Sequence, residues 1–127
     1  MGISILLDTS AAIEYFENSN EKVASAIKSE DFFEVLICGM TKFGLSVGLD
    51  DEEDIKRLDN IPCLGMDCSY FSKAAEVYKK LESVGKKPSF QDCVIAMAAV
   101  MNDSLLLTFD KDFRQFEEFG LKMKLLS

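Results

Sequence analysis

Short apolar runs alternate along the chain with segments of helical periodicity, and this alternation limits the possible folds more than any other feature. Runs typical of buried strands cover residues 3–7, 33–38, 61–64, 105–108 and 121–126. Segments typical of amphipathic or buried helices cover residues 9–16, 21–28, 41–48, 51–58, 67–81 and 93–101. Strands that alternate with helices predict an α/β sandwich with a mainly parallel sheet and right-handed crossovers.

The length and composition suit one domain. With 127 residues, of which 48% are hydrophobic, the chain can bury one sizeable core, and we expect a single domain over residues 1–127. No stretch approaches the roughly 20 apolar residues of a membrane-spanning helix, and the first residues lack the basic start of a signal peptide. We therefore expect a cytoplasmic protein with no membrane partner.

The chain contains no histidine, and this absence excludes several kinds of active site. Hydrolase triads need a histidine base in their usual forms, and the four cysteines contain no CxxC pair that would suit zinc. We expect the cysteines to be reduced and buried: Cys38, Cys63, Cys68 and Cys93. Any catalysis must then use carboxylates, lysine, tyrosine, a thiol, or a metal ion held by oxygen ligands.

Three aspartates are expected to meet at one edge of the sheet. Asp8 and Asp110 lie at the ends of two predicted strands, and Asp92 lies in the first turn of the buried helix. Ligands of parallel sheets bind outside the carboxyl ends of the strands, near a switch in strand order. Carboxylates without cationic partners repel one another there, and a bound Mg²⁺ or Mn²⁺ relieves the repulsion. Such a centre would also let a chain of net charge −8 act on a phosphodiester.

Each aspartate also has a purely structural explanation. Asp8 can cap the first helix, and Asp110 suits a turn or cap after its strand. Asp92 completes a pattern that resembles a capping box with Ser89. Any one of these acids alone is better explained as a cap, but their combination with the flanking residues favours a functional site.

Three segments carry a resemblance to a known family. They read LLDTSAAIEYF near the start, SFQDCVIAMAAVMND in the third quarter and LLLTFDKDF near the end. In this order and at this chain length they resemble the PIN domain, in particular the VapC-type toxin ribonucleases of prokaryotic toxin–antitoxin pairs. The resemblance implies a three-layer α/β/α sandwich and a Mg²⁺- or Mn²⁺-dependent endoribonuclease. It further implies an RNA substrate, a cognate antitoxin as partner, and a homodimer.

The resemblance assigns catalytic and metal-binding roles to the three aspartates. Asp8 matches the acid after the first strand, Asp92 the acid that opens the D-x-x-I-A helix, and Asp110 the acid after the T-x-D strand end. Supporting roles are expected for three polar neighbours: Ser10, Thr108 and Asp112. We expect the hydroxyls of Ser10 and Thr108 to orient the carboxylates. For Asp112 we favour capping of the next helix over a role at the metal site.

A glycine occupies the position of the family's fourth acid. The family has a glutamate in a pattern that resembles T-x-x-E-L-x-x-G, which falls on residues 41–48 here, with Gly44 in the glutamate position. A glycine inside a helix costs about 1 kcal/mol relative to alanine. We predict that Gly44 inactivates or weakens the nuclease, through natural loss or through a change that lets a toxic protein be expressed. The alternative is that Gly44 allows two helices to pack closely.

Other classes remain as alternatives. The main one is a non-catalytic PIN-like module that binds an antitoxin or RNA after decay of the metal site. A response-regulator-like receiver needs an acid pair after the first strand, where Asp8 stands alone. A haloacid-dehalogenase-like phosphatase needs an aspartate where Ser10 stands.

Overall fold

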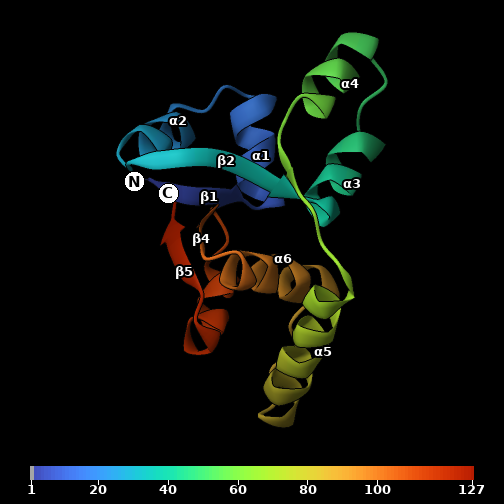
Figure 1. Cartoon of the computed structure of the whole chain (residues 1–127), viewed down its shortest axis with the longest axis vertical. Helices are drawn as coiled ribbons and strands as arrows, with labels where there is room; N and C mark the ends of the chain where they lie inside the picture. The colour runs from blue at the N-terminus through green and yellow to red at the C-terminus, as the bar shows by residue number, and fades with distance from the viewer. Residues whose placement is uncertain (1) are drawn as a thin grey trace.

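The computed structural model describes residues 2–127, which form one five-stranded sheet with helices on both faces (Figure 1). In chain order the elements are β1 (Ile3–Leu7), α1 (Thr9–Phe16), α2 (Glu21–Lys28), β2 (Phe32–Cys38), α3 (Gly39–Val47), α4 (Glu52–Asp59), β3 (Cys63–Leu64), α5 (Cys68–Ser83), α6 (Phe90–Met101), β4 (Ser104–Thr108), the 3-10 helix η1 (Lys111–Phe119) and β5 (Lys122–Leu125). This architecture confirms the predicted α/β class.

The strand order creates a switch point at the centre of the sheet. All strands pair in parallel, in the order β3-β2-β1-β4-β5. The chain builds outward from β1 through β2 to β3, and then crosses to the opposite side of β1 to add β4 and β5. The carboxyl ends of β1 and β4 therefore lie side by side where the winding reverses, which is the place where open parallel sheets bind ligands.

Residues of the central strands alternate between two hydrophobic clusters. Leu6 of β1, between Leu36 and Leu106 of its neighbours, faces a cluster formed with α5, α6 and η1. Ile5 and Leu7 face the opposite cluster, which is formed with α1, α2, α3 and α4. Burial on both faces explains why the strands read as continuous apolar runs. In Figure 1, α3 and α4 form an arm on one side and α5 projects away from the sheet.

Several predicted boundaries were wrong. The strand predicted at residues 61–64 pairs only over Cys63–Leu64, because Pro62 has no amide proton and contributes its carbonyl to the Ile37 amide instead. The helix predicted at residues 41–48 begins at Gly39 and continues through Gly44 without interruption. A helix was expected after Asp110, but neither its range nor its type was predicted: it is η1, a 3-10 helix of nine residues.

The prediction that every cysteine is buried was half wrong. All four are free, but Cys63 and Cys68 are exposed while Cys38 and Cys93 are buried. Cys68 opens α5 and Cys63 lies in the two-residue edge strand, so neither side chain is covered by a second layer. Within residues 2–127, no helix has both the length and the apolar character needed to cross a bilayer.

Candidate active site

Asp8 is a buried carboxylate at the carboxyl end of the central strand. It is 3% exposed, and its backbone amide donates to the Leu107 carbonyl of β4. Its Oδ1 accepts hydrogen bonds from the Ser10 hydroxyl and from the Ala11 amide, both at 2.8 Å. Its Oδ2 accepts one from the Thr108 hydroxyl at 2.6 Å. The carboxylate is thus the N-cap of α1, as expected, and it is also held from the neighbouring strand.

Two hydroxyl groups tie Asp8 to the segment that leaves β4. Thr108 Oγ1, which is fully buried, donates to Asp8 and accepts from the Asp110 amide at 2.9 Å. Ser10 Oγ donates to Asp8 and accepts from the Phe109 amide at 3.3 Å. Each hydroxyl therefore joins one carboxylate oxygen to one backbone amide across the switch point. These contacts restrain the Asp8 carboxylate from both sides.

Asp92 and Asp110 approach Asp8 from two other elements. Asp92 lies in the first turn of α6, where its amide donates to the Ser89 hydroxyl at 3.0 Å. Asp110 caps η1 by accepting from the Asp112 amide at 2.8 Å. The cap of η1 is therefore Asp110, and the prediction that Asp112 caps this helix was wrong: Asp112 is exposed in its first turn.

Burial and mutual repulsion disfavour charge on two of these acids. The pKa of Asp8 is raised, mainly by its burial and only slightly by the charge of Asp110. The pKa of Asp92 is also raised, first by its burial and then by the charge of Asp110, with a smaller effect of Asp8. The three carboxylates are therefore close enough to interact electrostatically, although they belong to three separate elements.

Asp67 shows what a purely capping aspartate looks like in this protein. It caps α5 by accepting from the Ser69 amide at 2.9 Å, and it is exposed. Its hydrogen bonds to Ser69 lower its pKa, as is usual for a cap that stabilises the charged form. Asp8 also caps a helix, yet its pKa moves in the opposite direction. Capping therefore accounts for the contacts of Asp8 but not for its burial beside two other acids.

The acids fit a divalent cation in donor type and charge. Mg²⁺ and Mn²⁺ prefer carboxylate oxygens, and no ion pair within residues 2–127 engages the three aspartates. Asp8 Oδ2 accepts a single hydrogen bond, so it keeps a second acceptor site. As the side chains stand in this part of the chain, no three acidic or thiol groups converge tightly enough to complete a cation site.

Gly44 lies next to Thr9, the residue that follows Asp8, and has room for a side chain. It is an exposed residue inside α3, and a Cβ built on it would meet only the Thr9 methyl, at 3.7 Å, which is an ordinary contact. The alternative explanation, that glycine is needed for close helix packing, is therefore wrong. Thr9 directly follows Asp8, so the open position faces the residue next to the buried carboxylate.

Sequence reasoning missed one contact at this place. The Thr9 and Thr41 hydroxyls lie 3.2 Å apart and join α1 to α3, and Thr41 is fully buried. The signal was present, since Thr41 opens the pattern whose fourth position is Gly44. A buried threonine on a helix face is nevertheless indistinguishable in sequence from an exposed one.

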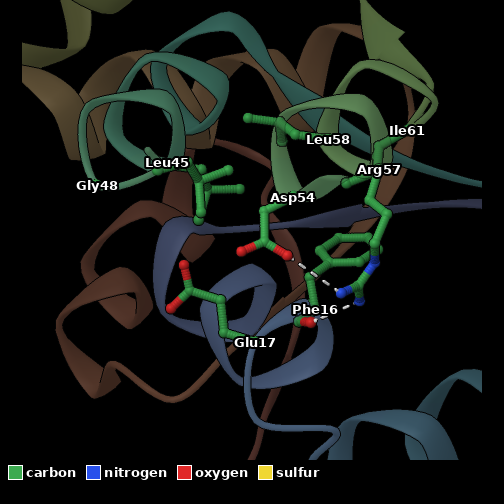
Figure 2. Close-up of a pocket in the computed structure, with 9 residues that line it drawn as sticks. Phe16, Glu17, Leu45, Gly48, Asp54, Arg57, Leu58 and Ile61 are labelled. Carbon is green, nitrogen blue, oxygen red and sulfur yellow. Dashed lines mark hydrogen bonds and ion pairs between the residues drawn. The ribbon is translucent and has the colours of Figure 1, made fainter. Parts of the chain in front are cut away.

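A separate hollow lies between α1, α3 and α4, and none of the three aspartates lines it (Figure 2). Its volume is about 340 Å³. Figure 2 shows Arg57 reaching across its edge to the Phe16 carbonyl, at 3.0 Å, and to Asp54, at 3.5 Å. Leu45 and Leu49 contribute apolar surface. The hollow is therefore distinct from the acidic site, and charged side chains line it beside the apolar ones: Glu17, Asp54 and Arg57.

The sequence matches the PIN domain family over residues 5–118. It is 32% identical over 118 residues to VapC ribonuclease Mb1587 of Mycobacterium bovis, and the alignment covers 86% of this chain and 88% of that protein. Ribonuclease VapC3 of Methanocaldococcus jannaschii is 30% identical over 91 residues, which cover 72% of this chain and 93% of that protein.

Solved structures show the same fold at lower identity. A chain of VapBC-1 from nontypeable Haemophilus influenzae superposes with a TM-score of 0.80 and 17% identity, covering 97% of this chain and 98% of that chain. A chain of VapBC2 from Rickettsia felis, in a structure bound to a DNA fragment from the VapBC2 promoter, superposes with a TM-score of 0.79 and 15% identity. The match covers 98% of this chain and 100% of that chain. The family match over residues 5–118 and the relatives at 30–32% identity show that the chain belongs to the PIN domain family.

Proposed function

We propose that this protein is a Mg²⁺- or Mn²⁺-dependent endoribonuclease, the toxin of a type II toxin–antitoxin pair that acts in the cytoplasm. The observation that carries the proposal is the group of unpaired carboxylates at the switch point of the sheet, two of which have raised pKa values. The VapC ribonucleases among its relatives support RNA as the substrate.

In this proposal Asp8, Asp92 and Asp110 hold the cation. Ser10 and Thr108 keep the Asp8 carboxylate in one orientation, since each donates to a different oxygen of it. The backbone amides at positions 109 and 110 in turn hold those hydroxyls. When bound, the cation lowers the pKa of a water molecule and stabilises the leaving oxygen of the phosphodiester. The exposed Asp112 is not among these ligands, and its charge adds only the last of the causes that raise the pKa of Asp92.

Gly44 weakens this activity because it leaves the site one carboxylate short. The family pattern has a glutamate there, and the exposed backbone beside Thr9 has space for one. Fewer anionic ligands bind a hard divalent cation less tightly. We therefore expect the chain as it stands to turn over RNA slowly or not at all.

Restoring the missing carboxylate tests the proposal. Gly44→Glu and the parent chain are incubated with a mixed RNA substrate in Mg²⁺, in Mn²⁺ and in a chelator. Gly44→Gln is the matched control, because it has nearly the same shape without the charge. We expect metal-dependent cleavage to rise only in Gly44→Glu. Equal cleavage by all three proteins, or none by any, would contradict the proposed role of these acids.

We also propose a cognate antitoxin as the partner and a homodimer as the assembly. The related solved structures carry the name VapBC, and one of them includes promoter DNA. The hollow between α1, α3 and α4 supports a contact for the antitoxin, because Leu45 and Leu49 line it beside acidic side chains. Val47, on the same helix, is exposed and does not line the hollow.

A non-catalytic module that binds an antitoxin or RNA is the second candidate, and the glycine at position 44 favours it. Calorimetric titration with Mn²⁺ separates the two. Tighter binding to Gly44→Glu than to the parent chain supports a nuclease that has lost one ligand. Equal and weak binding to both supports the binding module.

A further inference from the structure

A hydroxyl bridge holds α3 against the start of α1, directly beside the open position. Thr9 Oγ1 and Thr41 Oγ1 lie 3.2 Å apart, and either hydroxyl can donate. Thr41 is fully buried, and its other polar neighbour is the Cys38 sulfur, at 4.0 Å, which is a weak partner. The bridge to Thr9 is therefore the main hydrogen bond that satisfies the buried Thr41 side chain.

A second anchor lies one turn further along α3. Leu45 is 4% exposed and belongs to the hydrophobic cluster that contains Ala11 and Ala12 of α1. Residues four positions apart lie on the same face of a helix. The face of α3 that carries Thr41 and Leu45 is thus fixed on α1, and Gly44 lies at the border of that face.

Thr9 is also the residue that a side chain at position 44 would touch. The Cβ position of Gly44 is 3.7 Å from the Thr9 methyl, while the Thr9 hydroxyl bonds to Thr41. One threonine, adjacent in sequence to Asp8, therefore contacts α3 at both places. Apolar packing alone would hold the two helices together, but a hydrogen bond with a defined direction also restricts rotation and sliding of α3.

We propose that the bridge between Thr9 and Thr41 is a positioning contact, which sets where a side chain at position 44 lies relative to Asp8. This inference rests on the proposed function, because it concerns the place of the fourth carboxylate. In this proposal both threonines act through position 44 and not as ligands of the cation. The support for a side chain at position 44 is thus present although the position carries a glycine.

Mn²⁺ titration calorimetry on double variants tests the inference. In the Gly44→Glu chain, Thr41→Val removes the buried hydroxyl and keeps the side-chain shape, while Thr41→Ser keeps the hydroxyl. Thr9→Val breaks the same bridge from its partly exposed side, in case the buried change prevents folding. Ser46→Ala is the matched control: it removes an α3 hydroxyl that bonds only to the Lys42 carbonyl of its own helix, at 2.7 Å.

We expect Thr41→Val and Thr9→Val each to weaken Mn²⁺ binding about tenfold, as loss of an outer support of a metal ligand does. Thr41→Ser and Ser46→Ala should bind as Gly44→Glu does. Unchanged affinity in both valine variants would overturn the inference while leaving the proposed function intact. Equal losses in Thr41→Ser and Thr41→Val would also overturn it, because packing would then be responsible. If Gly44→Glu itself binds Mn²⁺ no more tightly than the parent chain does, the proposed function is refuted, and the inference with it.

Discussion

Replacing Gly44 with alanine tests whether the fold needs a bare backbone at this position. The residue lies inside α3, and among the described glycines only Gly85 and Gly120 have positive φ angles. An added Cβ meets the Thr9 methyl at an ordinary 3.7 Å. We therefore expect the full helix-propensity gain, about 1 kcal/mol in the free energy of unfolding. For a chain of 127 residues this corresponds to a rise in Tm of about 4 °C.

Melting curves from far-UV circular dichroism and urea titrations measure this change. Gly120→Ala is the opposing control, because its φ of 98° is left-handed and its Cβ would lie near the Val100 side chain. That variant should lose about 1–2 kcal/mol. A Tm for Gly44→Ala at or below that of the parent chain would refute the reasoning, since it would show that the backbone at position 44 must remain bare.

The glutamate variant extends the same measurement to the metal site. Gly44→Glu gains helix propensity but adds a negative charge beside Asp8, so its Tm in a chelator should fall below that of Gly44→Ala. Mn²⁺ at a hundred times its Kd should then stabilise it by about 2.7 kcal/mol. This corresponds to about 10 °C for a chain of this length. A Mn²⁺-induced rise in Tm of the same size in Gly44→Ala would contradict a role for the added carboxylate.

Three further outcomes are expected. Asp92→Asn should raise the Tm at pH 7, because burial and Asp110 raise the pKa of Asp92. The stabilisation from its bound proton is complete below the ordinary pKa of 3.8 and is lost as the pH rises through the folded value, so the gain should shrink towards pH 3 in a melting series. Phe116→Ala removes a fully buried ring and should cost about 3–5 kcal/mol in urea unfolding, and a loss under 1 kcal/mol would contradict its place in the core. In the native protein a maleimide should modify Cys63 and Cys68, seen as two additions by mass spectrometry, and four additions would show that the buried thiols are accessible.

Local patterns in the sequence were sufficient for most elements. The predicted ranges 3–7 and 21–28 coincide with β1 and α2, because an apolar run and a 3.6-residue period are visible without knowledge of neighbours. The extent of β3 was not predictable, since an edge strand exists only where β2 offers partners. The range and type of η1 were not predicted, because its hydrogen bonds span three residues, a period that sequence patterns do not separate from a turn.

The sequence by itself determined which side chains are present for chemistry: three aspartates, and a glycine at the position where the resemblance expects a fourth acid. Only the tertiary structure decided how they meet. Asp8 and Thr108 are 100 positions apart, and they bond because the strand order places β4 next to β1. The same order buries Asp8 and raises its pKa. Asp67 also caps a helix, but it stays exposed and its pKa is lowered. Capping is a local property of a few residues, whereas burial and repulsion depend on which distant elements pack together.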